Sequence, residues 1–152
     1  MRRARGRILR RQLIPLPLEE VTAYFEEPRN LQHLTPPWLG FHILEVPAGP
    51  VERGSAIRYR LRLFGIPMGW LTLIERSDPG WGFVDTQIEG PYASWVHTHL
   101  FSHRAEGVLM EDRVDYELPF GPLGFLAAPF IRVQLAAIFR YRRRTVQDLR
   151  LP

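Results

Sequence analysis

Residues 95–118, which read W-V-H-T-H-L-F-S-H-R-A-E-G-V-L-M-E-D-R-V-D-Y-E-L, constrain the fold more than any other segment. Two runs rich in Val, Leu, Phe and Tyr flank Glu106-Gly107, whose residue types suit a two-residue turn with positive φ. This pattern predicts a β-hairpin in which Ala105 lies opposite Val108. Side chains alternate along a strand, so one face carries Glu111, Arg113, Asp115 and Glu117 and is expected to be solvated. The opposite face is therefore expected to point into the core.

The inward face of this hairpin combines apolar side chains with polar ones. A loop of another length would slip the register by one residue and turn one strand over. Buried polar groups need partners, so we place the function of the chain on this face. Its polar members are His97, His99, His103, Asp112 and Tyr116, and its apolar members are Trp95, Phe101, Met110, Val114 and Leu118.

The rest of the chain predicts two short helices early, several strands and one long helix at the end. The expected strands are Ile8–Ile14, Phe41–Val46, Ser55–Leu63, Met68–Arg76 and Trp81–Ile88, and the expected helices are Leu18–Glu26, Asn30–Leu34 and Leu123–Leu149, the last kinked at Pro129. A Phe64–Pro67 turn is expected to place Leu61 opposite Trp70. Short connections favour an antiparallel meander. The long helix can bury its apolar stripe only against the concave face of a curved, seven-stranded sheet, which is an α+β arrangement.

Three segments and the order of elements carry a resemblance to a known family. Residues 17–38 read P-L-E-E-V-T-A-Y-F-E-E-P-R-N-L-Q-H-L-T-P-P-W, residues 90–101 read G-P-Y-A-S-W-V-H-T-H-L-F, and residues 116–124 read Y-E-L-P-F-G-P-L-G. From Ile8 to Leu149 the chain resembles the START-like (SRPBCC, helix-grip) superfamily, and most closely its stand-alone bacterial ligand-binding members. The resemblance implies a cavity between sheet and long helix for a hydrophobic or amphipathic molecule such as a lipid, a quinone or an aromatic polyketide. It implies no metal and no cofactor.

The candidate ligand-binding residues follow from the predicted faces together with this resemblance. They are Tyr59, Leu61, Trp70, Thr72, Trp95, His97, His99, Phe101, Asp112, Val114, Tyr116, Ile138 and Arg142. Apolar walls with a few polar anchors are typical of sites for small ligands. The superfamily includes carriers, sensors, chaperone cofactors and cyclases, so the fold does not decide among these activities.

The histidines admit three interpretations. His97 and His99 could bind a metal with Asp112 or His103 as third ligand, but the chain offers no further clustered ligand. Alternatively, Asp112 could orient an imidazole for proton transfer in a cyclase-like or hydrolase-like reaction, although no serine lies in a nucleophile signature. We favour the third interpretation, a semi-buried network that lines the cavity and orients a ligand, which favours binding over catalysis.

Arg142 lies on the apolar stripe of the long helix and needs an explanation of its own. It is expected either to pair with Asp85 or Asp112, or to extend its guanidinium into water while its stem covers the core. A row formed by Arg58, Arg60 and Arg62 on the outward face could contact an acidic protein partner or a second copy of the chain, which leaves an interaction module and a homodimer open. Nucleic acid is disfavoured, because no aromatic residues interleave with this row.

The composition of the chain limits the possible classes of fold, site and location. The chain has 152 residues, 45% of them hydrophobic, which suffices for one domain over residues 1–152 with a flexible basic start at residues 1–6. Its polarity and its 14 prolines disfavour stable insertion into a membrane. Cysteine is absent, which excludes disulfides and thiolate metal sites. No signal-peptide core is present near the start, so the expected location is the cytoplasm.

Overall fold

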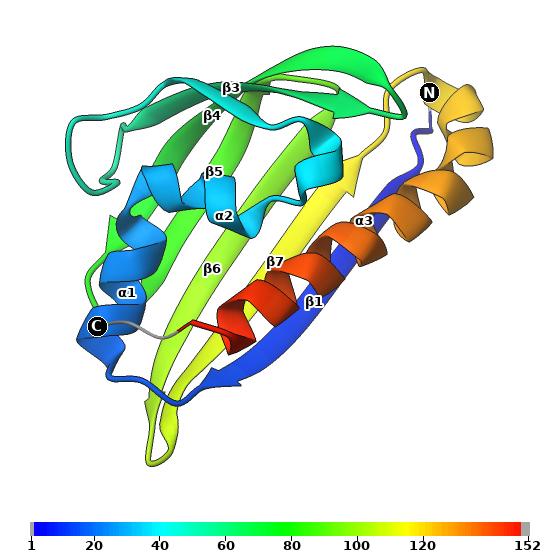
Figure 1. The fold of residues 1–152 in the computed structure, drawn as a ribbon. Helices are drawn as coiled ribbons and strands as arrows, with labels where there is room; N and C mark the ends of the chain where they lie inside the picture. The colour runs from blue at the N-terminus through cyan, green and yellow to red at the C-terminus, as the bar shows by residue number, and fades with distance from the viewer. Residues whose placement is uncertain (1, 150–152) are drawn as a thin grey trace.

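The computed structural model describes residues 2–149, which form a seven-stranded antiparallel sheet with one long helix across its concave side (Figure 1). The expected α+β helix-grip class is confirmed. The strands are β1 (Arg5–Ile14), β2 (His42–Glu45), β3 (Ala56–Leu63), β4 (Ile66–Asp78), β5 (Gly82–Glu89), β6 (Ser94–Arg104) and β7 (Gly107–Glu117). The helices are α1 (Leu18–Glu26), α2 (Leu31–Leu34) and α3 (Gly124–Gln147), with 3₁₀ turns η1 (Pro28–Asn30), η2 (Pro37–Leu39) and η3 (Gly121–Leu123).

The sheet order is β1-β7-β6-β5-β4-β3-β2, so β2 to β7 form a meander and β1 pairs with β7. The segment with α1 and α2 therefore crosses from one edge of the sheet to the other, on the same side as α3 (Figure 1). Pro15 and Pro17 follow β1 directly, and proline cannot continue a ladder. This crossing places α2 beside α3 over the concave face.

The core fills the space between the concave face and α3. Leu135 and Phe139 of α3 pack with inward residues of the central strands, among them Trp95 and Val114. A second cluster below α1 includes Phe25 and Val146. The inward face predicted from alternation is thus the buried one, while the outward face is exposed or half-buried.

Both hairpins pair two residues away from the predicted register. In β6–β7 the turn is Ala105-Glu106, so His99 lies opposite Asp112 and His103 opposite Val108. In β3–β4 the turn is Phe64-Gly65, both with positive φ, and Trp70 lies opposite Tyr59. A shift of two residues preserves the face of every side chain, because the period of a strand is two.

Gly107, the first residue of β7, lies against the end of β1. It has φ of +140°, and a Cβ atom there would collide with the backbone carbonyl of Ile14. The positive φ and the contact with β1 thus both require glycine at this position. His103 lies close to the turn and is exposed, so the expectation that it belongs to the inward polar cluster is wrong.

The two ends of the chain also differ from expectation. Strand β1 begins at Arg5, and Arg5 and Gly6 pair with Glu117 and Tyr116, so these two residues are not a flexible start. Met1 and residues 150–152 lie outside the described residues. Helix α3 is continuous through Pro129.

The segment Gly121–Gln147 is long and apolar enough to cross a membrane by length and composition. Its most apolar window has a mean hydropathy of 1.6, and 17% of that window is buried. Leu126, Phe130 and Val133 account for much of the exposed apolar surface of this helix. The α+β fold thus includes one apolar, largely exposed helix.

Candidate functional site

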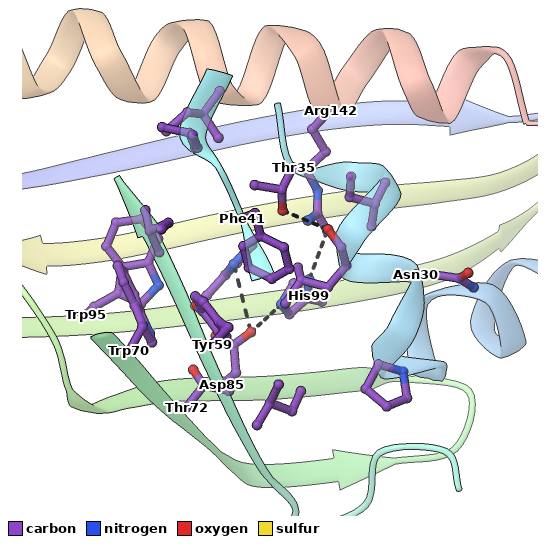
Figure 2. A pocket seen from close by; sticks show the side chains of 18 of the residues that line it. Asn30, Thr35, Phe41, Tyr59, Trp70, Thr72, Asp85, Trp95, His99 and Arg142 are labelled. Atoms are coloured by element: carbon purple, nitrogen blue, oxygen red, sulfur yellow. Dashed lines mark hydrogen bonds and ion pairs between the residues drawn. The ribbon is translucent and has the colours of Figure 1, made fainter. Parts of the chain in front are cut away.

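A cavity of about 170 Å³ lies between the concave face of the sheet and helices α2 and α3 (Figure 2). The predicted site residues that line it are Tyr59, Leu61, Trp70, Thr72, Trp95, His97, His99, Ile138 and Arg142. Phe101, Asp112, Val114 and Tyr116 do not line it, because α3 and the neighbouring side chains cover them in the core. A role of the lining residues in ligand binding remains a prediction.

Aromatic side chains form one wall of this cavity. Trp70 stacks on Tyr59 with ring centroids 5.7 Å apart, and it meets the edge of Trp95 at 5.3 Å. Tyr92 contacts both tryptophans. These contacts follow from the corrected register, which sets Tyr59 directly opposite Trp70 on neighbouring strands.

Asp85, His97 and His99 form the polar wall. Asp85 on β5 lies directly opposite His97 on β6, and His99 follows two residues later on the same face. The Asp85 carboxylate accepts a hydrogen bond from Nε2 of His99 at 2.5 Å and lies 3.8 Å from Nδ1 of His97. The two imidazoles stack with centroids 3.7 Å apart. Figure 2 shows Asp85 and His99 facing each other across the cavity wall.

Asp112 supports both imidazoles from below. Its Oδ1 atom lies 3.0 Å from Nε2 of His97 and 3.2 Å from Nδ1 of His99. Its other oxygen lies 3.3 Å from Nε of Arg142, which reaches down from α3. The Asp112 side chain is 2% exposed, so this carboxylate is held by its partners and not by solvent.

Arg142 is therefore a buried partner of Asp112. The alternative that its guanidinium extends into water is wrong, since only 9% of its side chain is exposed. Its guanidinium also lies over the Phe25 ring, 5.5 Å from the centroid. Arg142 thus connects helix α3 to Asp112 through an ion pair and to His99 of the polar wall through a guanidinium contact with Nδ1 at 3.4 Å.

The surroundings shift the pKa values of the four titratable groups in different directions. Burial would raise the pKa of Asp112, but the Arg142 charge and hydrogen bonds from both imidazoles hold it well below its ordinary value. Burial would also raise the pKa of Asp85, yet the His97 charge and the His99 hydrogen bond lower it. Both carboxylates are therefore ionised at neutral pH.

The two imidazoles differ from each other. Burial, together with the neighbouring His99, lowers the pKa of His97. Burial acts on the pKa of His99 in the same direction, but hydrogen bonds to Asp112 and Asp85 outweigh it, so this pKa is raised. The wall thus pairs a neutral imidazole with one that holds its proton more strongly, an arrangement suited to binding a polar group or moving a proton.

Sequence reasoning missed Asp85 as a member of this wall. It identified Asp85 only as a partner of Arg142, although Phe83 and Asp85 alternate onto the same face of the expected strand 81–88. Extending the face analysis from the hairpin to this strand would have found it. Asn30 at the end of η1 and Thr35 directly after α2 also line the cavity, and neither is among the site residues predicted from the sequence.

Comparison with known proteins supports the fold through structure alone. No family model and no curated protein matches the chain. Solved structures that match include protein CV1439 from Chromobacterium violaceum, with a TM-score of 0.74, 16% identity and coverage of 97% of this chain and 99% of that one. Protein TTHA0849 from Thermus thermophilus matches with a TM-score of 0.69, 18% identity and coverage of 94% and 95%.

Ginseng major latex-like protein 151 from Panax ginseng matches with a TM-score of 0.66, 17% identity and coverage of 97% and 99%. The fold is START-like. At these identities the comparisons support the helix-grip fold over nearly the full length of the chain. They give no information about a ligand or an activity.

Proposed function

We propose that this protein binds a small hydrophobic or amphipathic molecule in the cavity, with a polar group of that molecule directed at the Asp85, His97 and His99 wall. The observation that carries the proposal is a group of buried polar atoms without a hydrogen-bond partner among the described residues. They include Nε1 of Trp70, Oγ1 of Thr72 and the side-chain oxygen of Gln134, and all three residues line the cavity. A buried donor or acceptor left unpaired costs roughly 1–3 kcal/mol, which a ligand could recover.

Cavity size restricts the ligand class. A dry cavity of roughly 150 Å³ is known to accept benzene, so the present volume of about 170 Å³ suits a single substituted ring. A lipid, a quinone with a long tail or a polyketide would require α3 or α2 to move outward. A phenol or a ring ketone therefore fits the walls best, because it joins an apolar ring to one polar group.

The test uses the intrinsic fluorescence of the tryptophans in titrations with 4-methylphenol. We expect saturable quenching, and we expect Trp70→Phe to weaken binding by up to about tenfold, the equivalent of one lost hydrogen bond. Trp81→Phe is the matched control, since Trp81 stacks with Arg76 and does not line the cavity. Equal affinities in the two folded variants would contradict the proposed role of Trp70.

A second candidate function is general acid/base catalysis in the same cavity. It is favoured by the opposite pKa shifts of His97 and His99, since environments that separate two pKa values commonly assign acid and base roles. The neutral imidazole of His97 would then remove a proton from carbon next to a carbonyl. Hydrogen–deuterium exchange at the methyl group of acetophenone, followed by NMR in D₂O, tests this. Exchange no faster than in His97→Gln would exclude it.

A further inference from the structure

The three polar groups on the cavity wall have the composition of a metal-binding triad. One ligand atom each from Asp85, His97 and His99 lies within 4.8 Å of the other two. All three residues line the cavity, and their strands β5 and β6 are neighbours in the sheet. Two imidazoles and one carboxylate are a donor set that first-row divalent cations accept, with positions left open for other ligands.

A second layer holds the imidazoles in the orientation that such a site needs. Each ring turns one nitrogen toward Asp85 and the other toward Asp112: His97 presents Nδ1 to Asp85 and Nε2 to Asp112, and His99 does the reverse. Metal-ligating histidines commonly donate their second N–H to a carboxylate, which fixes the tautomer and the ring plane. One oxygen of Asp112 serves both rings here. Arg142 in turn holds the other oxygen.

The formal charge of the wall also favours a cation. Asp85 and Asp112 contribute two negative charges against the one positive charge of Arg142, so carboxylates outnumber the arginine cation in this cluster. The side chains of Asp85 and Asp112 are 16% and 2% exposed, so water screens this charge poorly. A cation between the Asp85 carboxylate and the two rings would compensate it directly.

We propose that Asp85, His97 and His99 bind a divalent transition-metal cation, with Zn²⁺ as the test ion, through Oδ2, Nδ1 and Nε2 respectively. The remaining coordination positions face the cavity. Two ligands of one zinc ion lie about 3.3 Å apart for bonds of about 2.0–2.1 Å, so the Asp85 carboxylate must withdraw from His99 by under about 1 Å. Asp85 borders the cavity, which provides that space.

In the sequence, the lack of a further clustered ligand argues against a metal site at His97 and His99. In the structure, Asp85 is such a third ligand. His103, another third ligand considered from the sequence, is exposed near the β6–β7 turn and lies outside the triad. The proposal is independent of the organic ligand proposed above, because it is tested with the cation alone.

The experiment is titration of EDTA-treated, dialysed protein with Zn²⁺ by calorimetry at pH 7.5, with metal content measured by inductively coupled plasma mass spectrometry. We expect one tightly bound ion per chain. Asp85→Asn and His97→Gln should each lose at least about 100-fold in affinity. Asp112→Asn should keep one site and lose about 10–100-fold, as expected for a carboxylate that acts through its histidines.

His103→Gln is the matched control, because it removes an exposed histidine from the same strand and should leave zinc affinity unchanged. NMR of the wild-type protein keeps the test independent of how the variants fold: zinc should shift the ring protons of His97 and His99 and leave those of His103 in place. Absence of saturable binding, or binding retained in both Asp85→Asn and His97→Gln, would overturn the proposal. Neither outcome would bear on phenol binding.

Discussion

At the scale of single residues, Asp112 is the group on which the polar wall depends. It accepts from two imidazoles and pairs with Arg142 while almost fully buried. Removal of one partner from a buried ion pair leaves an uncompensated charge, which typically costs about 3–5 kcal/mol. Asp112 therefore mainly stabilises the fold, and it affects the cavity through the two imidazole rings that it contacts.

We therefore predict that Asp112→Ala lowers the free energy of unfolding by about 3–5 kcal/mol in urea denaturation. Asp115→Ala, three residues along the same strand, should cost no more than about 1 kcal/mol, because its ion pair with Arg7 is half-exposed. Similar losses in the two variants would show that Arg142 does not rely on Asp112. For the same reason, a double variant with His99→Ala and Asp112→Ala would be difficult to keep folded and does not suit binding studies.

Tyr92 gives a prediction for alkaline pH. Burial, followed by the nearby Tyr116, raises the pKa of the Tyr92 hydroxyl above its ordinary value. The unfolded chain releases this proton near pH 10, whereas the folded chain retains it. The contribution to stability is therefore complete below about pH 10 and is lost as pH rises through the higher folded pKa.

The free energy of unfolding should thus decline from about pH 10 upward, and the decline should be shallower in Tyr92→Phe. Urea denaturation at a series of pH values from 9 to 11.5 measures both slopes. Identical slopes in wild type and variant would mean that Tyr92 ionises equally readily in the two states.

At the scale of elements, the alternation of apolar and polar residues predicts which face of a strand is buried better than it predicts which residues pair across two strands. The inward faces of β3 and β6 follow from period-two patterns, and the apolar stripe of α3 follows from period 3.6. Both hairpin registers differ from the predicted registers by two residues. A shift of two residues keeps every side chain on the same face, so the sequence pattern does not reveal it. Only the turn fixes the register, and the turn lies at Ala105-Glu106, directly before Gly107, which lies against β1.

This contact predicts a localised sensitivity to substitution. Gly107→Ala should destabilise the protein by about 1–3 kcal/mol, since it combines an unfavourable positive φ with a collision against the Ile14 carbonyl. Gly49→Ala should change stability by no more than about 0.5 kcal/mol, because nothing lies within 4 Å of its added Cβ. Thermal unfolding monitored by circular dichroism compares the two, and a neutral Gly107→Ala would show that β1 does not constrain the turn.

At the scale of the whole molecule, the fold could be predicted from the sequence, whereas the cavity could be predicted only in part. Helix and strand periodicities, short loops and the family resemblance of residues 17–38 together predict the architecture. The cavity also depends on residues at the two ends of the short helix α2, such as Asn30 and Thr35, and on cross-strand neighbours such as Asp85. These residues come together only where the sheet curves around α3, so the sequence pattern does not show that they share a cavity.

The arginine row on the outward face illustrates a prediction that stays open at this scale. Arg58 on β3 pairs across β4 with Glu89 on β5, while Arg60 and Arg62 are exposed. Association through this row with an acidic partner or a second copy would weaken steeply as salt rises. The exposed apolar side of α3 is separate from the row and would respond to salt differently.

The central claim is that a small polar ring molecule is held inside the cavity between the sheet and α3. The measurement that tests it most directly is the set of intermolecular nuclear Overhauser contacts between bound 4-methylphenol and the isotope-labelled protein. The account predicts contacts from the phenol ring to Trp95 and from the hydroxyl end to Trp70 and His99. Contacts confined to exposed side chains such as Phe130, with none to the cavity walls, would contradict it.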